Sequence, residues 1–179
     1  MIIYLIRHGK TAANEKHLYC GSTDLPLSEE GARALGRFPR ELQNVRFVTS
    51  GMKRTNETLK RLFGDVPFTE DPRFREMDFG LFEMHSYAEL KDTPAYQQWL
   101  SGDNEANPAP GGESGVQMKE RAWEAFSELR EDTVVVTHGG VIAAIMERLF
   151  PQEGKNRYQW QPAPGGGYVL DGSGYQKLE

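Results

Sequence analysis

The sequence predicts an α/β fold, a three-layer α/β/α sandwich around a mostly parallel central sheet. Two observations support this prediction. Strand-like runs of β-branched and aromatic residues alternate along the chain with segments of helical periodicity. Two of these runs, residues 2–6 and 133–137, are continuously strand-forming and do not alternate with charged residues. Continuous runs are typical of strands buried on both faces, as in the middle of a parallel sheet.

The expected elements follow one another in a regular order. Strands are expected at residues 2–6, 47–50, 68–69 and 133–137, with a terminal hairpin formed by 168–170 and 175–178. Helices are expected from Ser28 through Leu35 to Phe38, from Met52 to Phe63, from Ser86 to a break near Pro94, from Ser114 to Leu129, and from Val141 to Phe150. Residues 101–112 and 162–167 are rich in Gly and Pro and are expected to be loops.

Local signals justify the helix boundaries. Ser28, Ser86 and Ser114 suit the N-cap position, because a serine hydroxyl accepts a hydrogen bond from a free amide of the first turn. Pro39 interrupts the first helix, since proline has no amide hydrogen. Gly64 suits the position just after a helix, where the backbone often turns left-handed.

Composition and charge narrow the class of protein. The chain has 179 residues, which is typical of one domain, expected here to span 1–179. With 21 Lys+Arg against 26 Asp+Glu, the net charge is −5, which argues against nucleic-acid or membrane-surface binding. The single cysteine, Cys20, excludes an intramolecular disulfide and a Cys-based metal cluster. The apolar start of the chain ends at Arg7, too soon for a signal or membrane segment, so we expect a cytoplasmic protein.

Ionisable residues stand directly after the three central strands. Arg7, His8 and Gly9 follow the first strand, Ser50 and Arg54 the second, and His138, Gly139 and Gly140 the third. Ligands of open α/β sheets bind beyond the carboxyl ends of the strands, so we expect these residues to meet in one site. Paired guanidinium groups favour a phosphate or carboxylate and disfavour a metal cation. A histidine in such a site suits a nucleophile or an acid–base catalyst.

Seven segments resemble the histidine phosphatase superfamily, whose fold is that of phosphoglycerate mutase. In chain order they are Arg7-His8-Gly9; Thr11 and Asn14; Gly21 with residues 24–28 and Gly31; residues 50–58; residues 75–83; Pro110-Gly111-Gly112-Glu113-Ser114; and residues 136–140 with His138-Gly139. The matches cover nearly the whole chain in the family's order. Cys20 stands in place of a hydroxyl residue of the family pattern, and Met84 in place of a glycine. Phe79 and Gly140 stand where the mutases of the family have tyrosine and asparagine, which favours hydrolysis over mutase activity.

The resemblance implies a set of roles and a reaction. It implies that His8 is the nucleophile, that Arg7, Arg54 and His138 surround the phosphate, and that Glu76 is the general acid and then the general base. It also implies that Asn14, Thr11, Gly21 and Gly139 contact the substrate. It implies no metal and no cofactor. These residue types suit phosphoryl transfer, which needs positioning and charge neutralisation. One ring nitrogen of His8 must then be unprotonated, with the other held by a backbone carbonyl.

Three functions are compatible with this resemblance, and hydrolysis is favoured. The expected activity is that of a phosphatase, acting on a small phosphorylated metabolite such as a sugar phosphate or α-ribazole 5′-phosphate and releasing phosphate ion. The cap segment, residues 82–112, has Lys91 as its only Lys or Arg, which argues against the alternative of a phosphoglycerate mutase. A non-catalytic module that binds phosphate or a phosphopeptide is the other alternative. The protein is expected to be a monomer or a homodimer.

The cap carries aromatic residues with two interpretations. Tyr87, Tyr96 and Trp99, with Trp160 expected nearby, either stack on a ring of the substrate or form a hydrophobic pad that holds the cap. His17 and His85 lie off the matched positions and are expected at the surface or the pocket rim.

Overall fold

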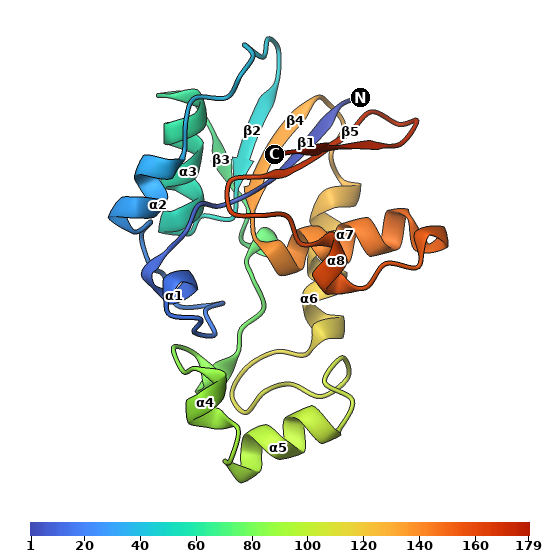
Figure 1. Ribbon diagram of the computed structural model, residues 1–179. Helices are drawn as coiled ribbons and strands as arrows, with labels where there is room; N and C mark the ends of the chain where they lie inside the picture. The colour runs from blue at the N-terminus through green and yellow to red at the C-terminus, as the bar shows by residue number, and fades with distance from the viewer.

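A computed structural model describes all residues, 1–179, and contains one six-stranded sheet (Figure 1). The strands are β1 (Ile3–Arg7), β2 (Arg46–Thr49), β3 (Thr69–Glu70), β4 (Thr133–Thr137), β5 (Gly167–Leu170) and β6 (Tyr175–Leu178), in the spatial order β3-β2-β4-β1-β5-β6. The first four strands of this order are mutually parallel, whereas β5 and β6 join as an antiparallel hairpin. The predicted α/β class and mostly parallel sheet are confirmed.

The helices connect the strands and form the cap. The α-helices are α1 (Ala12–Glu15), α2 (Glu29–Ala34), α3 (Lys53–Phe63), α4 (Tyr87–Leu90), α5 (Pro94–Ser101), α6 (Gly115–Ser127), α7 (Gly139–Leu149) and α8 (Arg157–Trp160). Three 3₁₀ turns, η1 (Pro72–Phe74), η2 (Gly80–Phe82) and η3 (Pro151–Glu153), lie between them. No helix combines the length and the apolar character needed to span a bilayer.

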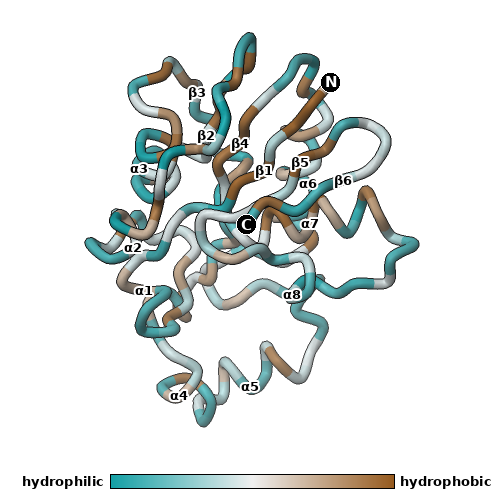
Figure 2. Tube along the Cα trace, turned by 45° about the horizontal axis from the view of Figure 1, so that its top comes forward, coloured by the Kyte–Doolittle hydropathy of each residue, from teal (hydrophilic) through white to brown (hydrophobic).

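Each face of the sheet has its own hydrophobic core. Tyr4 and Ile6 of β1 pack on one face with Leu59 of α3. Ile3 and Leu5 point to the opposite face and pack with residues of α6 and α7. Because neighbouring side chains of a strand point to opposite faces, a continuous apolar run fills both cores. Figure 2 shows β1 and β4 as mainly hydrophobic segments at the centre of the molecule.

Two helices differ from the expectation. The helix that begins after Ser28 ends at Ala34, and Leu35 already has extended backbone, so it does not reach Phe38. The segment after Ser86 does stop before Pro94, but Pro94 itself begins α5. Proline is tolerated in a first helical turn, because the amide it lacks would have no partner there. The one-turn helices α1 and α8 were not expected, since four residues are too few to show a period.

The cap lies beyond the carboxyl ends of the parallel strands, where α4 and α5 form the lower part of the molecule in Figure 1. Its interior is aromatic. Tyr96 and Trp99 are buried and pack with Phe82, and the Tyr96 hydroxyl lies 2.6 Å from that of Tyr19. These contacts make Tyr96 and Trp99 part of a hydrophobic pad, whereas Tyr87 is exposed.

Trp160 does not belong to the cap, contrary to expectation. It is buried against Phe150, Tyr168 and Tyr175, which lie at the hairpin end of the sheet. Met84, which stands at a usual glycine position, has a φ of 63°. The turn is thus retained with a strained methionine, whose amide donates to the Tyr19 carbonyl over 2.6 Å.

Candidate active site

The parallel pairing of β1 and β4 brings the two strand-end histidines together. Arg7 pairs with Thr137 at the carboxyl ends of the strands, so His8 and His138 follow side by side. The His8 amide donates to the Thr137 carbonyl over 3.0 Å, and the two ring centres are 5.2 Å apart. Both side chains are buried. The strand-exit residues expected to meet do so here.

His8 is held as a neutral imidazole with one free nitrogen. Its Nδ1 lies 2.6 Å from the Gly9 carbonyl oxygen, which can only accept, so Nδ1 carries the hydrogen. Nε2 therefore keeps its lone pair. Burial lowers the pKa of His8 from 6.5 to about 3, and the nearby positive charges of Arg54 and Arg7 act in the same direction. The ring is thus neutral and nucleophilic at neutral pH.

His138 is buried with one ring nitrogen unpaired. Its Nε2 lies 2.8 Å from the Ser50 hydroxyl, which in turn lies 3.0 Å from the Thr55 hydroxyl. Its Nδ1 is buried and has no hydrogen-bond partner. Burial, followed by the charge of Arg54, lowers the pKa of His138 well below its usual value. A buried polar atom without a partner is uncommon in a folded protein, so His138 Nδ1 can bond to a ligand of the site.

Two guanidinium groups face the histidines without a carboxylate bonded to them. Arg54, in the first turn of α3, is 1% exposed and donates to the carbonyls of Gly21 and Thr23, each over 2.8 Å. Arg7 donates to the Pro162 carbonyl over 2.8 Å, and its Nε is buried without a partner. Burial lowers the pKa of Arg7, an effect that the negative charge of Glu76 opposes. Arg54 is buried and Arg7 half-buried, and cations that lack a bonded anion in such surroundings suit an anionic ligand.

Glu76 reaches the site from an irregular segment. Its Oε1 accepts from its neighbour's amide, that of Met77, and its Oε2 accepts from the Gly140 amide, each over 3.0 Å. Gly140 lies in the first turn of α7, and a side chain at that position would collide with the Glu76 carboxylate. Glycine at this position thus lets the Glu76 carboxylate approach the first turn of α7.

The four residues predicted to contact the substrate differ in how many of their polar groups already have partners within the protein. Thr11 uses its amide and hydroxyl to donate to Asn14 Oδ1, over 2.9 and 3.0 Å, which leaves the Asn14 amide NH₂ free. Gly21 donates its amide to Glu83 and offers its carbonyl to Arg54, so both its polar groups have partners within the protein. Gly139 packs closely: an added Cβ would lie 3.1 Å from Arg7 Nε. Substrate contact by these residues remains a prediction.

A cavity of about 230 Å³ opens next to this cluster. It is lined by Arg7, Leu18, Tyr19, Cys20, Glu76, Met77, Phe79, Met118, Lys119, Gly140, Ala144, Glu147, Arg157 and Gln161. The polar residues from α6, α7 and α8 were not expected, because they follow no strand and match no motif. Lys119 and Arg157 both form ion pairs with Glu105 of the cap loop, and Lys119 also lies 3.5 Å from Glu147.

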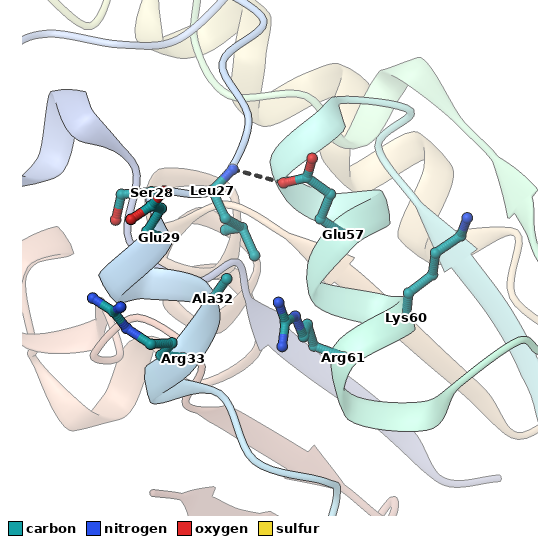
Figure 3. Close-up of a pocket in the computed structure, with 8 residues that line it drawn as sticks. All are labelled: Leu27, Ser28, Glu29, Ala32, Arg33, Glu57, Lys60 and Arg61. Carbon is teal, nitrogen blue, oxygen red and sulfur yellow. Dashed lines mark hydrogen bonds between the residues drawn. The ribbon is translucent and has the colours of Figure 1, made fainter.

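A larger hollow, of about 780 Å³, lies elsewhere, between α2 and α3 (Figure 3). It is lined by Leu27, Ser28, Glu29, Ala32, Arg33, Glu57, Lys60 and Arg61, none of which is a predicted site residue. Glu57 crosses its upper part and accepts from the Leu27 amide over 2.7 Å. His17 and His85 are exposed, as expected, and line neither of these two cavities. No group of three or more His, Cys, Asp or Glu side chains is arranged to hold a metal ion.

The fold and this cluster together define an α/β protein with two buried histidines and two guanidinium groups without bonded carboxylates at its strand ends. Residues 3–177 match the model of the histidine phosphatase superfamily (branch 1), and the chain belongs to that family. The resemblance seen in the sequence is thereby confirmed.

The chain is similar to proteins named as phosphatases and to proteins named as probable phosphoglycerate mutases. The adenosylcobalamin/α-ribazole phosphatase of Salmonella typhimurium is 29% identical over 96% of this chain and 90% of its own length. The "probable phosphoglycerate mutase GpmB" of Yersinia pestis is 27% identical over 96% of this chain and 92% of its own. The crystal structure of TTHB049 from Thermus thermophilus superposes with a TM-score of 0.80 at 29% identity, covering 100% of this chain and 99% of that one.

Proposed function

We propose that this protein is a phosphomonoester hydrolase that works through a phosphohistidine at His8 and needs no metal ion. The observation that carries the proposal is the state of His8. Its Nδ1 is held by the Gly9 carbonyl, its pKa is lowered by burial, and two guanidinium groups without bonded carboxylates lie beside it. Family membership and the phosphatase relatives support the same class of activity.

The first step transfers the phosphoryl group to the protein. The lone pair of His8 Nε2 forms the N–P bond while the bond between phosphorus and the ester oxygen breaks. The Glu76 carboxyl gives its proton to that oxygen, so the alcohol leaves neutral. The Gly9 carbonyl stays bonded to Nδ1–H and stabilises the positive charge that develops on the ring.

The second step returns the protein to its starting state. Glu76, now a carboxylate, takes a proton from water as the water oxygen forms a bond with phosphorus. The N–P bond breaks and its electron pair returns to Nε2, so inorganic phosphate and neutral His8 are the products. Arg7, Arg54 and His138 bind the equatorial oxygens in both steps, and the two guanidinium groups supply the charge neutralisation that phosphoryl transfer requires.

The size and the lining of the cavity support a small substrate. A volume of about 230 Å³ lies below the range of ~300–1,000 Å³ typical of drug-sized ligands, which favours a small leaving alcohol such as a sugar. Its wall is aromatic at Tyr19 and Phe79 and polar at Gln161, which suits a ring that bears hydroxyl groups. An α-ribazole 5′-phosphate, which carries a larger leaving alcohol, is the other candidate.

A panel of phosphorylated metabolites tests the proposal. Wild type, His8→Gln and the surface control His85→Gln are incubated with sugar phosphates, α-ribazole 5′-phosphate and 3-phosphoglycerate, each with EDTA. We expect inorganic phosphate from wild type and from the control, and none from His8→Gln. Transfer between the 2 and 3 positions of phosphoglycerate without release of phosphate would establish a mutase instead. Binding of phosphate without any turnover would establish a binding module.

A further inference from the structure

The general-acid residue of the proposed mechanism sits on a segment with no regular secondary structure. Residues 75–79 run between η1 and η2, and Figure 1 shows this stretch as a long connection from the sheet toward the cap. A segment outside helices and sheets must find partners for its backbone groups elsewhere, or it remains mobile. Glu76 needs a fixed place, because proton transfer depends on hydrogen-bond distance to the leaving oxygen.

Arg121, on α6, supplies those partners. Its Nη1 donates to the carbonyls of Arg73 and Arg75, over 2.7 and 2.5 Å, and its Nη2 donates to the carbonyl of Glu76 itself, over 3.0 Å. One planar guanidinium therefore binds three carbonyls within four residues of chain. Lysine cannot reproduce this pattern, since its ammonium is a single point of charge.

Glu113 completes the arrangement from the opposite side. Its carboxylate pairs with Arg121, accepting from Nε over 3.1 Å and also from Nη2, and it accepts from the Asp78 amide over 3.1 Å. The Glu113 amide in turn donates to the Asp78 carbonyl over 3.0 Å. The side chains of Arg121 and Glu113 are only 23% and 20% exposed, so solvent screens this pair less than a surface pair.

We propose that Arg121 and Glu113 are positioning residues that hold the Glu76 segment so that its carboxyl reaches the leaving-group oxygen. Neither residue touches the reacting atoms. This inference rests on the proposed function, in which Glu76 donates the proton. It predicts a specific defect: loss of either residue slows the reactions that need an acid and largely spares those that do not.

Leaving-group dependence tests the inference. A simple alcohol needs a proton to leave, whereas p-nitrophenol leaves as a stable anion, so kcat/KM for glycerol phosphate and p-nitrophenyl phosphate reports the acid in the first step. We expect Arg121→Gln to lower kcat/KM about 100-fold for glycerol phosphate and less than about 5-fold for p-nitrophenyl phosphate. In a Glu76→Gln background, Arg121→Gln is expected to cause no further loss with glycerol phosphate.

Matched variants separate positioning from folding. Arg148→Gln removes another arginine of the α6–α7 layer, one that stacks on Trp123 and bonds to none of residues 73–78, and it is expected to leave both rates unchanged. Should Arg121→Gln fail to fold, Arg121→Lys and Glu113→Gln are expected to show the same selectivity at smaller size. If these variants lose kcat/KM equally with both substrates while Glu76→Gln loses it only with glycerol phosphate, the positioning role is refuted and the proposed function stands. A Glu76→Gln variant without selectivity would overturn both.

Discussion

Acidification is expected to destabilise the free protein through its buried histidines. An imidazole that stays neutral in the folded state takes up a proton only when the chain unfolds, so unfolding binds protons as the pH falls below about 6.5. For His8, whose pKa burial lowers to about 3, the unfolded state binds more protons throughout the interval from about pH 6.5 to about pH 3. Stability is therefore fully present above that interval and is lost as the pH falls through it.

The size of this effect follows from the two pKa values. Between about pH 7.5 and about pH 5, protonation of an unfolded imidazole with pKa ~6.5 lowers the free energy of unfolding by about 2 kcal/mol, while the folded ring stays neutral. His138, whose pKa burial also lowers, contributes in the same direction. This decrease in the free energy of unfolding is an upper bound, because a small opening of the site lets the His8 ring take up a proton without global unfolding.

Urea unfolding at the two pH values measures the effect. We expect the wild type to lose about 2 kcal/mol more on acidification than His8→Gln does, with His17→Gln, at the surface, as the control for removing one imidazole from the unfolded chain. Equal losses in wild type and His8→Gln would refute the buried neutral state of His8, and with it the reason given for its nucleophilicity.

Three further predictions concern the site. Gly140→Ala is expected to displace the Glu76 carboxylate and to lower kcat for an alkyl phosphate about 100-fold, with melting temperature measured alongside to show that the fold persists. Inorganic phosphate at about 100 times its Kd is expected to raise stability by about 2.7 kcal/mol in urea titrations, and Arg54→Gln to abolish this gain, because it removes a buried cation of the anion site. Glu105→Ala is expected to raise the ratio of kcat/KM for a ribonucleoside 5′-phosphate to that for a triose phosphate about 5-fold, because it breaks the ion pairs with Lys119 and Arg157 beside the cavity. An unchanged ratio in steady-state assays would show that Glu105 does not limit the size of the leaving group.

Much of the fold and the centre of the site could be predicted from the sequence, for physical reasons. Continuous runs such as residues 133–137 indicate buried strands, and parallel strands bring their carboxyl ends to one edge, so His8 and His138 were expected at the same edge. The pairing of β1 with β4, which the sequence does not indicate, places the two rings side by side. Helix ends were less predictable, because Pro94 can interrupt a helix or begin one, and both signals look alike in one sequence.

Contacts between residues that lie far apart in the sequence could not be predicted in the same way. Arg121 lies on the periodic helix α6, where an arginine ordinarily faces solvent, and nothing local shows that it binds the carbonyls of Arg73, Arg75 and Glu76. Gln161 follows the one-turn helix α8, whose Trp160 packs against Tyr168 and Tyr175 of the hairpin, and no local pattern indicates that it lines the cavity. Such contacts depend on packing between distant segments, which no sequence period encodes.

Chemical identification of the covalent intermediate tests the central claim most directly. The protein is mixed with a substrate labelled with ³²P in the phosphoryl group and quenched in alkali, where phosphohistidine survives, and the labelled peptide is then sequenced. We predict one labelled site, at His8, in the wild type and in His85→Gln, and no label in His8→Gln. Label on another residue, or turnover by wild type with no labelled protein at any quench time, would contradict it.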